Sequence, residues 1–422
     1  MTSSPDRATA TVAPPAPRPA ERPLQLTPAT AGQLTLDAMF ARVAARKPDH
    51  TAVRVGSGRL TYRGAEHRAR QLASLLVLGG VQLGDPVIVN CVDHRRSLVA
   101  QLAVLKAGGV VVPVPAGTPD AALPEIAALS GAQTVLCGRA HRAAWDGVQL
   151  VVPMDDPATW QRAEAVRPDD SLPRSSPIDP AYLLLAPGTD TVPGPTGELI
   201  DHRAWQLAAA ARIQRVGAVE HGVEIRQPAP GGPVTLAAMW WAVASAGTLY
   251  CGSPEGTLTR SPVAMLTPQQ YDRLLVPGAP GPRTVVLVGD PCPAELAARH
   301  RALLPTSRLW AEFAPAGGAL PWTAIDLSHP GEPASAAAGR RRGLNVGGAV
   351  AGVRIQILDE HGGAALPGGI GEVCAVGPAL AFDRVFHHAP GRAFNPDPGP
   401  VLHASLRGRH TPTDHLTVFP QP

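Results

Sequence analysis

Residues 87–114 read VIVNCVDHRRSLVAQLAVLKAGGVVVPV. A β-branched run, Val87–Asn90, is followed by a longer segment with helical spacing, Leu98–Ala107, and then by a second β-branched run, Val110–Val114. Short apolar runs predict buried strands, and a longer amphipathic segment between them predicts the helix that joins two parallel strands. The stretch therefore predicts a βαβ unit.

The same alternation continues on both sides of this unit. Before it, apolar residues recur at helical spacing and form one stripe, made of Tyr62, Ala65, Ala69, Leu72, Ala73 and Leu76. After it, strands are expected at Tyr182–Leu185, Thr284–Val288 and Arg354–Leu358. Strands that alternate with helices indicate an α/β fold whose sheets are covered by helices.

Composition limits the functions that the chain could have. Its 422 residues carry 37 basic and 34 acidic side chains, a net charge of +3, and no long basic run, so nothing points to nucleic acid as a partner. Lys47 and Lys106 are the only lysines in the sequence. Any mechanism that needs a lysine in the last three quarters of the chain is therefore excluded.

The cysteines and the N-terminus indicate where the protein works. The five cysteines are widely spaced, with no CxxC pair, which favours free thiols in a reducing compartment. The N-terminus has no apolar signal core, and no apolar run reaches the length of a membrane span. We therefore expect a cytoplasmic protein with no membrane partner.

Three segments differ in composition. Residues 1–31 are rich in Pro and Ala and show almost no apolar periodicity, which predicts a disordered tail. Residues 32–342 contain the alternating strands and helices of the α/β core. Residues 343–422 are rich in strand and turn signals and are expected to form a small β-rich subdomain. Pro-rich stretches near 155–180 and 328–342 are predicted to be surface connections.

Four blocks of the sequence resemble the signature motifs of one enzyme family. They are Leu60–Tyr62, Gly84–Val89, Leu102–Val114 and Leu358–Val373. Their residues and order are similar to those of adenylate-forming enzymes, above all the adenylation domains of nonribosomal peptide synthetases. The resemblance implies a large N-terminal body of layered sheets and helices with a small β-rich subdomain. It also implies a mobile C-terminal lid domain that delivers a catalytic lysine, and this lid is expected to be absent here.

The family's phosphate-binding loop corresponds to residues 185–197, which read LAPGTDTVPGPTG. Such loops hold ATP through small residues whose backbone N–H groups approach the phosphates, together with hydroxyls and one lysine. The resemblance puts Thr196 in the place of the lysine and Asp190, a negative charge, beside the phosphate position. The remaining candidates for ATP binding in this loop are Gly188, Thr189, Thr196 and Gly197.

Two further ATP-binding blocks are also altered. The family's Asn-x-Tyr-Gly-Pro-Thr-Glu corresponds to residues 311–317, AEFAPAG, so that Gly317 replaces the glutamate that binds magnesium. Phe313 keeps an aromatic ring that can stack on adenine, and Glu312 falls at the family's variable position. The aspartate that holds the ribose is replaced by Ser405, which can make one neutral hydrogen bond.

The substrate side of the site departs from the family as well. Gly232 and Pro233 stand where amino-acid-activating relatives place the aspartate that binds the substrate amino group. Trp240 and Trp241 are candidates to line an acyl pocket, although aromatic residues on an apolar helix are more often core. His202 matches the family histidine after the loop and either contacts substrate or a loop carbonyl, or caps the next helix. Any ligand is then expected to be an uncharged or aryl acid.

These replacements predict a noncatalytic relative of adenylation domains that acts as an interaction or accessory protein in nonribosomal peptide or natural-product biosynthesis. Its expected partner is a synthetase, a carrier protein or a small accessory protein. No residue is assigned a catalytic role, and no cofactor is expected. No metal site is predicted, because the five histidines from position 387 to position 415 lack paired spacing. The alternative is a residual ligase that activates a non-amino carboxylic acid with ATP and Mg²⁺, with a C-terminal domain supplied by another chain.

Overall fold

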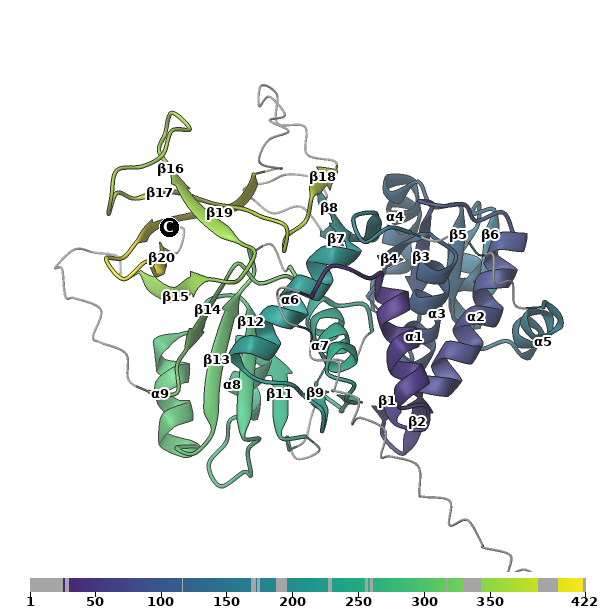
Figure 1. The fold of residues 1–422 in the computed structure, drawn as a ribbon, viewed down its shortest axis with the longest axis horizontal. Coiled ribbons are helices and arrows are strands. Elements are labelled where there is room, and N and C mark those ends of the chain that lie inside the picture. Colours follow the sequence, from purple (N-terminus) through teal and green to yellow (C-terminus); the bar gives the residue numbers. More distant parts are fainter. Residues whose placement is uncertain are drawn as a thin grey trace, which may run out of the picture.

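The computed structural model describes residues 26, 30–115, 117–167, 172, 175–186, 196–226, 230–254, 257–258, 261–315, 318–329, 343–385 and 401–419. Except for Leu26 and residues 30–31, the predicted disordered tail lies outside these residues. Two sheets of strands dominate the described part, and helices lie beside and between them (Figure 1). The α/β class expected from the sequence is confirmed.

The first sheet has seven strands and contains the βαβ unit. Its strands, in spatial order, are β18 (Asp383–Val385), β8 (Thr196–Asp201), β7 (Pro180–Ala186), β4 (Val110–Pro113), β3 (Pro86–Asn90), β5 (Thr134–Cys137) and β6 (Leu150–Pro153). The strands from β7 to β6 are parallel, whereas β8 and β18 are antiparallel to their neighbours. The predicted strands at 87–90 and 110–114 are therefore confirmed as neighbouring parallel strands.

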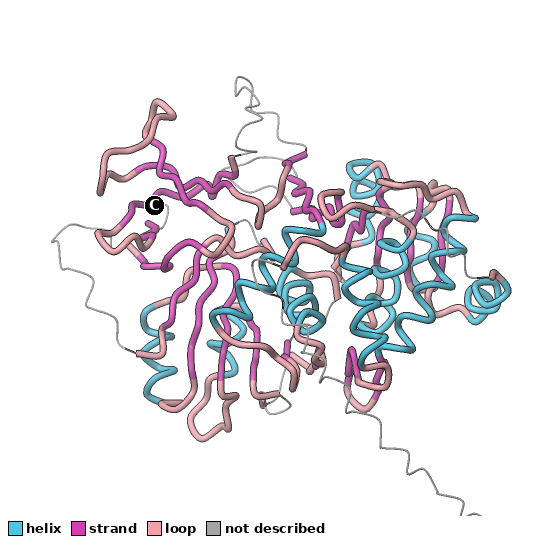
Figure 2. Tube along the Cα trace, viewed as in Figure 1, coloured by secondary structure: helices cyan, strands magenta, loops and turns pink. Residues whose placement is uncertain are grey.

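The second sheet has thirteen strands and joins the α/β core to the β-rich end of the chain. In spatial order they are β16 (Arg354–Leu358), β17 (Gly371–Val376), β19 (Leu402–His410), β20 (Leu416–Phe419), β15 (Leu344–Ala349), β14 (Thr323–Asp326), β13 (Arg308–Phe313), β12 (Thr284–Gly289), β11 (Val263–Leu266), β9 (Val223–Ile225), β10 (Leu249–Cys251), β1 (Thr51–Val55) and β2 (Gly58–Thr61). The run from β13 to β1 is parallel, and the remaining pairs are antiparallel. Figure 2 shows that the described residues of 343–419 are strands and loops without a helix.

Nine α-helices occur among the described residues. They are α1 (Leu36–Arg46), α2 (Tyr62–Leu78), α3 (His94–Lys106), α4 (Leu123–Ser130), α5 (Pro157–Ala165), α6 (His202–Arg215), α7 (Pro233–Ala244), α8 (Pro268–Leu274) and α9 (Ala294–Leu303), with short 3₁₀ turns η1 (Asp120–Ala122) and η2 (Arg139–Trp145). Helix α5 lies within the stretch near 155–180 that the sequence predicts to be a surface connection, and most of its residues are exposed. Asp156 caps this helix and Pro157 is its first residue, a start signal that the proline content of the segment had hidden.

Helix α3 lies between the two sheets. It contacts β3 and β4 of the first sheet and β1 of the second. Every residue of the helix is buried except Arg95 and Arg96 at its start. The sequence predicts an amphipathic helix here, but its polar residues Gln101 and Lys106 are buried as well, because α3 is covered by a sheet on two sides. Gly108 ends the helix with φ +80°, a left-handed conformation that glycine adopts at no steric cost.

As the cysteine spacing led us to expect, none of the five cysteines, all of them among the described residues, forms a disulfide, and four are buried. Burial raises the pKa of the Cys137 thiol to about 12, so this group stays protonated near neutral pH. None of the described helices combines the length and the apolar character that a bilayer crossing requires.

Candidate functional site

The predicted phosphate-binding loop connects two paired strands, β7 and β8. Ala186 pairs with Thr196 at the loop end of this hairpin. The loop itself, residues 187–195, lies outside the described residues, and Gly188 and Thr189 lie in it. Of the four predicted loop contacts, Thr196 begins β8, and Gly197 is buried and pairs with Leu185. The ATP contacts assigned to these four residues stay a prediction.

The end of β8 leads directly into α6 through a pair of buried titratable residues. Asp201 caps α6 by accepting a hydrogen bond from the Ala204 N–H at 2.6 Å, and burial raises its pKa to about 6. His202 follows with no exposed surface. Its Nδ1 accepts a hydrogen bond from the Leu36 N–H at 3.0 Å, and burial lowers its pKa to about 4.

His202 thus caps a helix, but a helix far away in the sequence. Leu36 is the first residue of α1, whereas the helix that follows His202 is capped by Asp201. Accepting a hydrogen bond at Nδ1 places the proton of the neutral ring on Nε2, and no described residue accepts a hydrogen bond from that buried nitrogen. The ring ties the start of α1 to the start of α6. Its predicted contact with a substrate stays a prediction.

The second predicted block lies at the carboxyl end of β13. In open parallel sheets, ligands bind beyond the carboxyl ends of the strands, so Phe313 and the residues that follow it are at the expected edge. The Phe313 ring is 3% exposed and belongs to the main hydrophobic core. This leaves almost no surface of the ring for an adenine to stack on, and the stacking role stays a prediction. Ala316 and Gly317 lie outside the described residues.

Glu312, which precedes Phe313, forms a buried ion pair with Arg212 of α6. The Arg212 Nε donates to both carboxylate oxygens, at 3.0 and 2.8 Å, and its Nη2 donates to the Ala319 carbonyl at 3.2 Å. Both side chains are nearly inaccessible to water. The negative charge of Glu312 is therefore neutralised inside the protein, and the pair joins α6 to the second sheet.

The fold brings the two altered blocks close together, although they are more than a hundred residues apart in the sequence. A Cβ placed on Gly318, just after the second block, would lie 3.9 Å from Oε2 of Glu198 on β8. The Trp322 N–H donates to the Phe313 carbonyl at 2.8 Å and turns the chain back after β13. The β7–β8 hairpin and the end of β13 thus form the two sides of one candidate site.

The two predicted acyl-pocket residues belong to the core. Trp240 is 1% exposed and Trp241 has no exposed surface on α7. The Trp240 Nε1–H donates to the Tyr182 hydroxyl at 3.1 Å, and that hydroxyl donates to Oε1 of Gln101 at 2.7 Å. This chain of hydrogen bonds joins α7, β7 and α3 in the interior, which matches the core alternative for the tryptophans. Their role in an acyl pocket stays a prediction.

Gly232 and Ser405, which stand where the family places aspartates for the substrate amino group and for the ribose, both lie among the described residues. Gly232 is the N-cap residue of α7 and provides no side-chain cap, so the helix start offers no carboxylate to an ammonium group. Ser405 lies within β19 in the left-handed conformation, with φ +55°. A serine in this conformation is uncommon and marks an irregularity in the strand.

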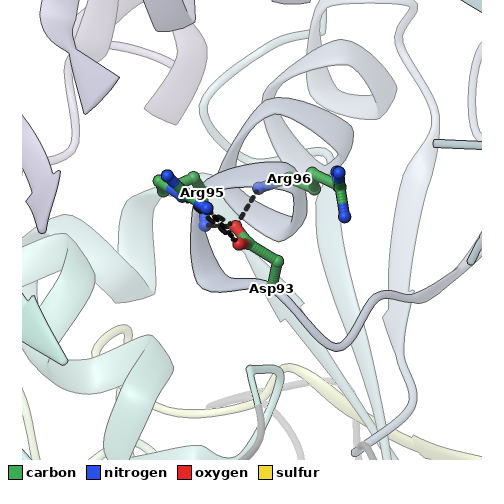
Figure 3. Close-up of polar contacts among 3 residues, drawn as sticks. All are labelled: Asp93, Arg95 and Arg96. Atoms are coloured by element: carbon green, nitrogen blue, oxygen red, sulfur yellow. Dashed lines mark hydrogen bonds and ion pairs between the residues drawn. The ribbon is translucent and has the colours of Figure 1, made fainter. Parts of the chain in front are cut away.

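Asp93, which the sequence analysis did not single out, forms a polar cluster at the carboxyl end of β3. It follows β3 and caps α3 by accepting hydrogen bonds from the backbone N–H groups of Arg95 and Arg96, while its carboxylate pairs with the Arg95 guanidinium at 2.6 Å (Figure 3). Burial would raise the pKa of Asp93, but these hydrogen bonds outweigh it and hold the pKa below its ordinary value. An aspartate just before a helical pattern is an N-cap signal that could have identified it.

Three side chains of types that bind metals lie close together in the β-rich region, although no metal site is predicted from the sequence. Glu372, Cys374 and His403 place one possible ligand atom each within 4.8 Å of one another. They come from β17 and β19, and their sequence spacing carries no metal-site signature. Only the pairing of the two strands brings them together.

Comparison with known proteins places this architecture in a family. The family model described as "AMP-binding enzyme" matches residues 40–382. The chain belongs to the AMP-binding enzyme family. Its resemblance to adenylate-forming enzymes, including the adenylation domains of nonribosomal peptide synthetases, is thereby confirmed.

Two curated relatives are large synthetases. Phosphinothricin tripeptide synthetase PhsC of Streptomyces viridochromogenes is 32% identical over 280 residues, which cover 62% of this chain and 25% of that protein. Tyrocidine synthase 2 of Brevibacillus parabrevis is 25% identical over 363 residues, which cover 82% of this chain and 10% of that protein. The chain therefore spans a quarter or less of the length of these two relatives.

Among solved structures, the N-terminal subdomain of NpsA from Klebsiella oxytoca in complex with 3-hydroxybenzoyl-AMSN has a TM-score of 0.76 and 17% identity. The match covers 92% of this chain and 98% of that subdomain. At this identity the comparison establishes the fold: a layered α/β body that corresponds to the N-terminal part of adenylation enzymes.

Proposed function

We propose that this member of the AMP-binding family is noncatalytic and acts through binding to other proteins in nonribosomal peptide or natural-product assembly. One observation carries the proposal: the hydrophobic core of the fold is retained, whereas the residues expected to bind ATP and magnesium are not. The described residues pack around an extensive hydrophobic core, while the charged groups that hold ATP and magnesium in the family are replaced by Thr196 and Gly317. The acidic group that remains beside the second position, Glu312, is neutralised by Arg212.

Neither lysine of the chain can replace the positive charge of the family's loop lysine, whose position is occupied by Thr196. Lys106 ends α3, immediately before β4, and pairs with Glu66 at 2.8 Å. The loop at 187–195 follows the carboxyl end of β7, which runs parallel to β4, so Lys106 lies near the opposite edge of the sheet. Lys47 follows α1, and its Nζ donates to the Ala246 carbonyl at 3.3 Å. Neither ammonium group is placed beside the β7–β8 hairpin.

Adenylation depends on such charges. Attack of a carboxylate on the α-phosphate of ATP builds negative charge that cations must stabilise, and the loss of one preorganised contact of this kind costs about 3 kcal/mol in the barrier. Several losses at one site are not additive, but together they lower the rate far more than one does. A site without the lysine, the glutamate and the ribose carboxylate is therefore expected to have no measurable ligase activity.

The partner that we propose is a synthetase, a carrier protein or a small accessory protein of the same assembly. Relatives of the chain are segments of large synthetases, and one structure of this fold is described as an artificially fused adenylation–PCP di-domain. We also propose that the protein works in the cytoplasm, which is supported by the absence of a disulfide among its five cysteines, all of them described.

Nucleotide binding is the first test. The full chain is titrated with ATP and Mg²⁺ in a calorimeter, alone and with a pool of aryl, fatty and amino acids. We expect no saturable binding at millimolar nucleotide from a protein that melts cooperatively. Acid-dependent pyrophosphate exchange that disappears in Thr196→Ala or Asp190→Ala would overturn the noncatalytic assignment.

The interaction is tested separately. The full chain is used as bait in the producing strain, and recovered synthetase or carrier components are purified and mixed with it at equal concentration. Co-elution as a complex in size-exclusion chromatography supports the proposal, and failure to recover any component of an assembly line contradicts it.

One observation favours a second candidate, a residual ligase. The N-terminal subdomain of NpsA is described in complex with 3-hydroxybenzoyl-AMSN, so a subdomain of this fold holds an aryl ligand. For the present chain this candidate predicts ATP- and Mg²⁺-dependent activation of a non-amino acid. Binding of an aryl-AMSN analogue that is competed by ATP would favour it over the noncatalytic function.

A further inference from the structure

A cluster of three metal-binding side chains lies on the antiparallel pair β17–β19, at the upper left of Figure 1. Glu372 and Cys374 are two residues apart on β17, and side chains two apart on a strand point to the same face. Cys374 is directly opposite His403 on β19. Directly opposed residues of an antiparallel pair are close enough for their side chains to meet.

An irregularity of β19 shapes the same spot. Glu372 pairs with Arg407 and Cys374 pairs with His403, so β19 uses four residues where β17 uses two. Ser405, in the left-handed conformation, lies inside this bulge. Bulges bend a strand and redirect its side chains. Here the bulge lies beside the point where the three polar side chains converge.

The Glu372 carboxylate and the Cys374 sulfur both lie close to the same atom, Nδ1 of His403. Nδ1 of His403 lies 2.9 Å from Oε1 of Glu372 and 3.2 Å from Sγ of Cys374. An imidazole nitrogen carries either one proton or one lone pair, so Nδ1 either donates its proton to the Glu372 carboxylate or accepts the proton of the Cys374 thiol, and it cannot do both at once. A cation placed among the three atoms would be contacted by all of them at once, through a carboxylate, a thiolate and a ring nitrogen.

We propose that Glu372, Cys374 and His403 bind one Zn²⁺ ion, with a water molecule as the fourth ligand. Thiolate and imidazole ligands suit zinc rather than magnesium or calcium, which prefer oxygen ligands alone. With bonds of about 2.3 Å to sulfur and about 2.0 Å to nitrogen, tetrahedral zinc holds these two atoms about 3.5 Å apart. The 3.2 Å observed between Sγ and Nδ1 needs to open by only a few tenths of an ångström.

Charge and exposure fit such an ion. Cys374 is buried, whereas the side chains of His403 and Glu372 are 22% and 35% exposed, so the ion enters from solvent and the open position faces it. One thiolate and one carboxylate balance the two positive charges of zinc. Binding releases the proton of the Cys374 thiol, and that of Nδ1 where it carries one, to solvent, so the affinity falls as the pH falls. The bound ion joins β17 to β19.

Cobalt is the probe that reports thiolate coordination directly. The full chain, carrying no histidine tag, is stripped with a chelator and titrated with Co²⁺ and then with Zn²⁺. We expect one Co²⁺ per chain, with a thiolate-to-cobalt charge-transfer band in the near ultraviolet that one equivalent of Zn²⁺ abolishes. The zinc-loaded protein should also melt at a higher temperature than the stripped protein, whereas Mg²⁺ should cause no shift.

Variants assign the ligands. Cys374→Ser should abolish the charge-transfer band, and Glu372→Gln and His403→Gln should weaken Zn²⁺ binding by more than about 10-fold, because even outer partners of a metal site contribute 10- to 100-fold. Cys292→Ser, which removes a partly exposed thiol elsewhere in the fold, and His415→Gln, in the same β-rich region, should bind as the wild type does. Absence of saturable binding in the wild type, or an unchanged band in Cys374→Ser, would overturn the proposal. Since Glu372→Gln keeps the shape of the side chain, its result decides the question if the cysteine variant fails to fold.

Discussion

The buried histidine between α1 and α6 should make the fold sensitive to mild acid. In the folded protein, burial holds the pKa of His202 at about 4, against 6.5 for the free side chain, even though the charges of Asp37 and Asp179 act in the opposite direction. A group whose folded pKa is depressed stabilises the fold fully above its unfolded pKa, and this stabilisation is lost as the pH falls toward the folded pKa. The loss is therefore expected between about pH 6.5 and pH 4.

The size of the effect follows from the pKa difference. A difference of roughly 2.5 pKa units corresponds to about 3 kcal/mol at 1.36 kcal/mol per unit. Integrated over the titration, about 2 kcal/mol is lost between roughly pH 7 and pH 5 and the rest by about pH 4. This is a large share of the 5–15 kcal/mol that typically stabilises a folded domain.

A matched pair of variants isolates this contribution. His202→Asn can keep an acceptor for the Leu36 N–H and cannot be protonated, whereas His221→Asn replaces an exposed histidine. The free energy of unfolding in urea is measured for each protein at several pH values from 7 to about 4.5. We expect wild type and His221→Asn to lose about 2 kcal/mol more than His202→Asn over this range.

Asp201, the neighbour of His202, has the opposite linkage. Burial raises its pKa from 3.8 to about 6, so its contribution to stability grows as the pH falls through that window. Because this carboxyl group is present in all three proteins, its effect largely cancels in the comparison. Parallel pH profiles for wild type and His202→Asn would refute the argument that a buried neutral imidazole holds α1 in place.

Three further predictions test the packing around the candidate site. Removing either Arg212 or Glu312 alone should lower the free energy of unfolding by about 3–5 kcal/mol, because a buried charge loses its partner. An Arg212→Met/Glu312→Leu double variant should lose much less than the sum of the two single losses. Additive losses in urea unfolding would contradict the ion pair. Tyr182→Phe removes the hydroxyl between the indole of α7 and the amide of α3 and should cost about 1–3 kcal/mol in thermal unfolding, with an unchanged melting temperature counting against that network. Gly347 has φ +89°, and Gly347→Ala adds a Cβ that collides with a carbonyl of β14. It should therefore lower the free energy of unfolding by more than the about 1–2 kcal/mol expected for Gly362→Ala, where φ is +78° and no atom lies within 4 Å of the added Cβ. Equal losses in the two variants would show that the strand relaxes around the new methyl group.

Local patterns predicted the elements of this fold well. The strands at 87–90, 182–185, 284–288 and 354–358 are confirmed, and so is the helix that carries the apolar stripe from Tyr62. Each depends on residues a few positions apart, whose spacing reports the period of a strand or a helix directly. The helix within 155–180 was missed because proline was taken as a breaker, although it is favoured at the first position of a helix.

The candidate site was predictable only as a pair of blocks. Family resemblance indicated that the β7–β8 hairpin and the end of β13 act together, and the structure brings Gly318 next to Glu198. The partners of individual side chains were not predictable from spacing. Arg212 is a hundred residues from Glu312, and His202 contacts the first turn of a helix 166 residues earlier.

Local sequence patterns were enough to predict the α/β class, the βαβ unit at the centre of the first sheet, and which residue types occupy the ATP-binding blocks. The tertiary structure alone decided what those side chains do. It placed α3 between two sheets, neutralised Glu312 with Arg212, and set the β17–β19 register that puts Cys374 opposite His403. The physical reason is that periodicity and turn signals are local properties of the chain, whereas register, burial and charge pairing depend on residues that only folding brings together.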